Sequence, residues 1–284
     1  TDPRVDRNGD LPPHWSHDIY ERQPDQYLTM VYNRLTFYAW PRYYHRVFND
    51  LMRYGVGDIT HSSGHHDHFN QWMWQRLLWS PRMTVEAVVN EYCKTWFGEE
   101  ASQLMAEAIF QLEENIEEDR ENPLDQKIGV DKYYEMVKKA GERMPAEIMK
   151  NNWLWRMYMQ KAALDVYVKL SLIQQKAFQD RIESNVASLL NGDASTTIKE
   201  ILNEFSPSVF EQETPEMEAL RIEAVNLGEE SNELFGVRND GIYNLQHDFI
   251  GLGWLYRQLE RVEMTSLLPR DKSFQLTSSG QATQ

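Results

Sequence analysis

The segment from Gly55 to Gly98 has the sequence GVGDITHSSGHHDHFNQWMWQRLLWSPRMTVEAVVNEYCKTWFG. It starts with a short apolar run, Val56 to Thr60, which precedes a polar loop containing four histidines between His61 and His68. An aromatic helical stretch follows and ends at a Ser-Pro pair, after which Thr84 is placed to cap an amphipathic helix that ends at Gly98. The order of strand, polar loop and helix is typical of the closing unit of a β/α barrel.

A similar unit precedes this segment. Tyr27 to Tyr32 is an apolar run, the loop Asn33 to Trp40 follows it, and Pro41 opens a helix that ends before Gly55. The helix length predicts a right-handed β/α/β crossover, with Tyr27–Val31 and Val56–Thr60 as adjacent parallel strands. A complete barrel needs about 250 residues, so we expect the earlier strands on a missing N-terminal segment or on another chain. The absence of methionine at position 1 agrees with that expectation.

The chain after Gly98 has the apolar spacing of helices almost throughout. One apolar stripe is followed by the acidic run around Glu113, Glu114 and Glu117, which we interpret as a solvated helix face. The predicted fold is therefore mixed α/β, then all-α. We predict three parts: residues 1–98 form the last two strand–helix units of a TIM-like barrel and a linker helix, residues 99–264 form a C-terminal α-helical domain, and residues 265–284 form a mobile polar tail.

The motifs of the Gly55–Gly98 segment resemble those of a group of bacterial polysaccharide-degrading proteins, the α-glucuronidase-like and hexosaminidase-like barrels. The likeness extends over about Tyr27 to Leu112. The matching residues are Arg76 to Trp79, Pro81, Val85, Val88, Glu91, Tyr92, Trp96 to Gly98 and Ala101. The resemblance implies a secreted or periplasmic glycoside hydrolase whose catalytic carboxylates come from earlier barrel strands. Several such relatives have a glutamate where this chain has His61 and Ser62.

Composition limits the classes of partner. The formal net charge of −15 disfavours nucleic acid, whose phosphates would be repelled. No run of the sequence is long and apolar enough for a membrane span. Cys93 is the only cysteine, so a disulfide within the chain is excluded, and its apolar helical setting predicts an inert thiol.

Substrate-binding residues are expected at the carboxyl ends of the two predicted strands. We predict that Asn33, Arg34, Trp40, His61 and His66 line one cleft and orient sugar hydroxyls, because histidine offers both a donor and an acceptor and a flat indole suits the apolar face of a sugar. Two alternatives for the histidines stay open. They could bind zinc or nickel through His65, His66 and His68, or they could satisfy backbone groups of the turn. We predict no metal and no cofactor.

No convincing pair of catalytic carboxylates follows either strand, so the catalytic residues are unknown and enzymatic activity is uncertain. Two hypotheses remain. In the first, the chain is part of a glycoside hydrolase, to which it contributes carbohydrate-binding loops and a helical accessory domain that buttresses the barrel or forms a homodimer. In the second, it is a non-catalytic helical module that binds glycans or other proteins.

Overall fold

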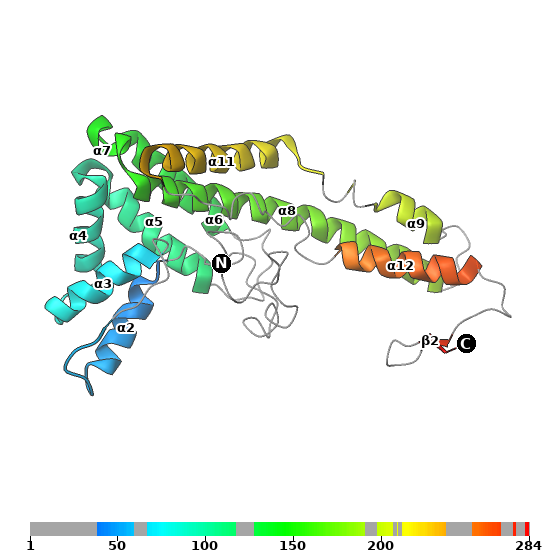
Figure 1. Cartoon of the computed structure of the whole chain (residues 1–284), viewed down its shortest axis with the longest axis horizontal. Helices are drawn as coiled ribbons and strands as arrows, with labels where there is room; N and C mark the ends of the chain where they lie inside the picture. Colours follow the sequence, from blue (N-terminus) through cyan, green and yellow to red (C-terminus); the bar gives the residue numbers. More distant parts are fainter. Residues whose placement is uncertain are drawn as a thin grey trace. The chain divides into compact units, whose positions relative to one another are not determined.

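The computed structural model describes residues 39–59, 67–117, 128–190, 198–206, 209, 212–236 and 252–267, together with two short strands near the end of the chain. Its helices are α2 (Pro41–Leu51), α3 (His68–Trp79), α4 (Val85–Phe97), α5 (Glu99–Glu117), α6 (Ile128–Arg143), α7 (Ala146–Lys150), α8 (Trp153–Leu190), α9 (Ile198–Glu204), α11 (Pro215–Phe235) and α12 (Leu252–Leu267) (Figure 1). The strands β1 (Gln275–Leu276) and β2 (Ala282–Thr283) pair antiparallel.

The barrel prediction is wrong for the part of the chain that can be described, because that part is helical apart from the two-residue strands β1 and β2 and contains no parallel sheet. Residues 56–59 of the expected closing strand adopt no strand conformation, and the side chains of Val56 and Ile59 are fully exposed. A short apolar run becomes a strand only when a neighbouring strand satisfies its backbone groups and covers its side chains. The other predicted strand, Tyr27–Tyr32, lies outside the described residues. The helical expectation for the region after Gly98 agrees with α5 to α12.

The helices belong to two compact units. The first contains α2 to α7, the part of α8 up to Lys169, and α11 from Glu218 onward. The second contains the rest of α8, α9 and α12, with a core of Ile182, Ile201, Phe205 and Leu252. None of the described helices combines the length and the apolar character needed to cross a membrane.

Local signals in the sequence account for both ends of α4. The Thr84 hydroxyl oxygen accepts a hydrogen bond from the Ala87 N–H at 3.2 Å, as an N-cap does. Gly98 ends the helix with a φ of 82°, in the left-handed region that favours glycine. A Cβ atom at Gly98 would also lie 2.9 Å from Cδ1 of Ile148, so the helix end is closely packed.

The start of α2 depends on partners that are distant in sequence. Pro41 occupies its first turn, and the Trp40 side chain makes no cap hydrogen bond. The Tyr43 N–H instead donates to the Glu113 carboxylate at 3.0 Å, and the Trp40 N–H donates to Asn70 Oδ1 at 3.0 Å. Glu113 is completely buried, which corrects the prediction that it belongs to a solvated acidic face. Its carboxylate accepts a hydrogen bond from a backbone N–H at the start of α2, which has no partner within the helix.

The part of α8 that belongs to the first unit is buried on nearly all sides. Between Leu154 and Lys169 every residue except Trp155 is buried. This stretch includes the long polar side chains Arg156, Gln160, Lys161, Asp165 and Lys169. Buried polar groups are tolerated only when they are hydrogen-bonded or paired, so the neighbouring helices must supply partners.

Those partners come from α6 and α11 as well as from α8 itself. Gln160 Nε2 donates to the Ala224 carbonyl at 2.8 Å, and Arg156 Nε donates to Glu230 at 3.1 Å, so α11 lies alongside α8 (Figure 1). Lys169 is paired with Asp131 of α6. Lys161 is paired with Asp165 one turn further along α8, with both side chains buried. The helices of this unit are therefore connected by specific polar bonds as well as by apolar contacts.

The contact between α6 and α8 generates a stability prediction. The Trp155 indole N–H donates to the Val137 carbonyl at 3.0 Å, and a Cβ atom at Gly141 would lie 2.4 Å from Cζ2 of Trp155. Intrinsic helix propensity favours Gly141→Ala by about 1 kcal/mol, whereas overpacking costs about 1 to 3 kcal/mol. We expect Gly141→Ala to lower the free energy of unfolding in urea. The control Gly57→Ala meets open space and should be nearly neutral. Stabilisation by Gly141→Ala would contradict this packing.

Candidate functional site

Of the five residues predicted to bind substrate, the structure places only Trp40. Asn33, Arg34, His61 and His66 lie outside the described residues. Trp40 precedes α2, where its backbone N–H is bonded to Asn70 and its ring centroid lies 4.9 Å from that of Tyr43. The prediction that these five residues share a cleft therefore stays a prediction.

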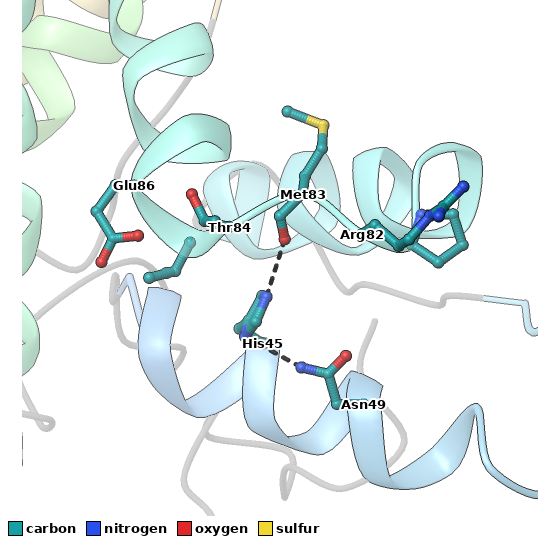
Figure 2. Close-up of a pocket in the computed structure, with 8 residues that line it drawn as sticks. His45, Asn49, Arg82, Met83, Thr84 and Glu86 are labelled. Atoms are coloured by element: carbon teal, nitrogen blue, oxygen red, sulfur yellow. Dashed lines mark hydrogen bonds between the residues drawn. The ribbon is translucent and has the colours of Figure 1, made fainter.

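An open cleft lies between α2 and the connection from α3 to α4, and Figure 2 shows the residues that line it. They are His45, Asn49, Pro81, Arg82, Met83, Thr84, Val85 and Glu86. His45 Nε2 lies 3.0 Å from the Met83 carbonyl oxygen, and the Asn49 amide nitrogen lies 3.2 Å from His45 Nδ1. Because a carbonyl only accepts and an amide NH₂ only donates, the ring hydrogen is on Nε2.

Both ring nitrogens of His45 are therefore already hydrogen-bonded. The imidazole connects α2 to the turn that precedes α4, as the dashed lines in Figure 2 show. A general base or a metal ligand needs a ring nitrogen that can reach its target. The geometry of His45 consequently suits a structural connection between helices better than chemistry in this cleft.

A second candidate is the aromatic cluster around His68, defined here as His68, Trp72, Tyr92, Trp96 and Trp153. His68 Nδ1 lies 3.1 Å from the Tyr92 hydroxyl. Its ring is nearly perpendicular to those of Trp96 and Trp153, with centroids 5.0 and 5.4 Å away. Trp72 packs edge-on against both Tyr92 and Trp96. The cluster thus joins α3, α4 and the start of α8.

Burial determines the protonation states of the two titratable groups in this cluster, His68 and Tyr92. It lowers the pKa of His68, and it raises the pKa of Tyr92 well above its usual range. Both groups are therefore neutral at physiological pH, and the contact between His68 Nδ1 and the Tyr92 hydroxyl is a hydrogen bond between two neutral groups. His68 had been a candidate metal ligand on sequence grounds. Among the described residues, no group of three or more His, Cys, Asp or Glu side chains could hold a metal ion.

A polar junction adjoins this cluster. Asn152 Nδ2 donates to the Trp96 carbonyl at 2.6 Å, while Asn152 Oδ1 accepts from the Trp155 N–H at 2.8 Å and so caps α8. Arg156 Nη1 donates to the carbonyls of Met149 and Asn152 at 3.0 and 3.1 Å. The end of α4, the end of α7 and the start of α8 are thereby fixed together. Asn152 directly before a helical apolar run is the sequence signal that could have indicated this cap.

Two further residues carry groups that could take part in chemistry or binding. Cys93 is fully buried, and burial raises the pKa of its thiol well above the usual range, so it is a packing residue. Arg42, two residues after Trp40, lies 3.4 Å from Glu113 and 4.6 Å from the centre of the Phe110 ring. Its guanidinium is therefore engaged with α5.

Comparison with known proteins gives no neighbour. No family model matches the chain, and neither a curated protein nor a solved structure is similar to it.

The His68 cluster predicts a pH dependence of stability. Because the folded pKa lies below the unfolded value of about 6.5, the neutral imidazole's contribution is complete above that value. It is lost as the pH falls below about 6.5 toward the folded pKa, since the unfolded chain then binds the proton more readily. Urea unfolding at a series of pH values should show wild-type stability falling more steeply with acid than that of His68→Phe. Identical slopes would contradict a buried neutral His68.

Proposed function

We propose that the described helices form a non-catalytic helical module whose role is to bind another protein. The observation that supports this best is the use of the polar side chains. His45, His68, Asn152 and Arg156 are each hydrogen-bonded between helices or between a helix and a turn. Glu113 caps a helix. Groups that could do chemistry in a cleft are thus engaged in holding the fold together.

The Lys161–Asp165 pair is the strongest case for a catalytic alternative, because buried charges are common in active sites. Both side chains are at most 2% exposed, so a substrate could not reach them without a large opening of the unit. A buried ion pair adds little net stability and can be replaced by apolar residues of similar volume. Its most direct role here is to satisfy polar groups on the buried face of α8.

The glycoside hydrolase hypothesis depends on other residues. It needs the predicted sugar-binding residues outside the described part of the chain, and its support is the resemblance of the packing motifs between Tyr27 and Leu112. It remains the alternative proposal, and the experiment that follows separates the two.

A charge-removal series tests the structural role of the pair. Lys161→Met alone leaves the Asp165 carboxylate buried without its ammonium partner, and we expect a loss of about 3 to 5 kcal/mol in unfolding free energy. The double variant Lys161→Met/Asp165→Leu should recover most of that loss. Wild-type and double-variant chains are also incubated with a panel of plant and host polysaccharides, and reducing-sugar release is measured. Hydrolysis by the wild type would overturn the proposal: its loss in the double variant would place catalysis at the pair, and its retention there would support the glycoside hydrolase alternative.

A further inference from the structure

We draw no further inference here: the strongest candidate, the pair of buried indole N–H groups of Trp72 and Trp96 in the aromatic cluster around His68, carries none, since these donors meet no acceptor among the described residues and nothing in the structure shows which ligand would bind them.

Discussion

The first unit depends on one constraint, which is the burial of α8 between Leu154 and Lys169 together with its polar side chains. A helix that is buried on nearly all sides must find partners for every long polar group, since each unpaired one costs several kcal/mol. Arg156 and Gln160 find them on α11, and Lys169 finds one on α6. These bonds favour the observed arrangement of α6 and α11, because sliding either helix along α8 would leave buried groups unsatisfied. Apolar packing alone would tolerate several arrangements.

The same logic extends outward from α8. Asn152 caps its first turn and binds the last turn of α4, so that the aromatic cluster around His68 is built on a fixed frame. Further out, Glu113 of α5 satisfies the start of α2. The end of α4 and the start of α2 are each satisfied by a side chain that is distant in sequence, whereas α8 is capped by the residue directly before it. The polar residues of the unit are thus part of its architecture, and this is the physical basis for proposing a binding module in place of an enzyme.

Local features were predictable from the sequence, and long-range ones were not. Thr84 and Gly98 bound α4 as expected, since capping depends on residues within one turn. The expected closing strand failed because its apolar run has no described neighbour to pair with. Glu113 was assigned to a solvated face because its partner, the start of α2, is about 70 residues away in sequence. Trp79, at the end of the aromatic stretch that forms α3, is 83% exposed. Of the five predicted sugar-binding residues, the structure describes only Trp40. The hypothesis that they share a cleft therefore still depends on their positions in the sequence.

The central claim is that α8 is buried between Leu154 and Lys169. Amide hydrogen exchange of the full chain, followed by mass spectrometry, tests it directly, because it compares this stretch with the exposed segment 56–59. We expect the slowest exchange in residues 154–169, where the backbone is helical and buried. We expect exchange close to the unprotected rate for Val56 and Gly57, whose segment is neither helix nor strand and is exposed. Strong protection of Val56 and Gly57 in the isolated chain, or rapid exchange within residues 154–169, would contradict these expectations.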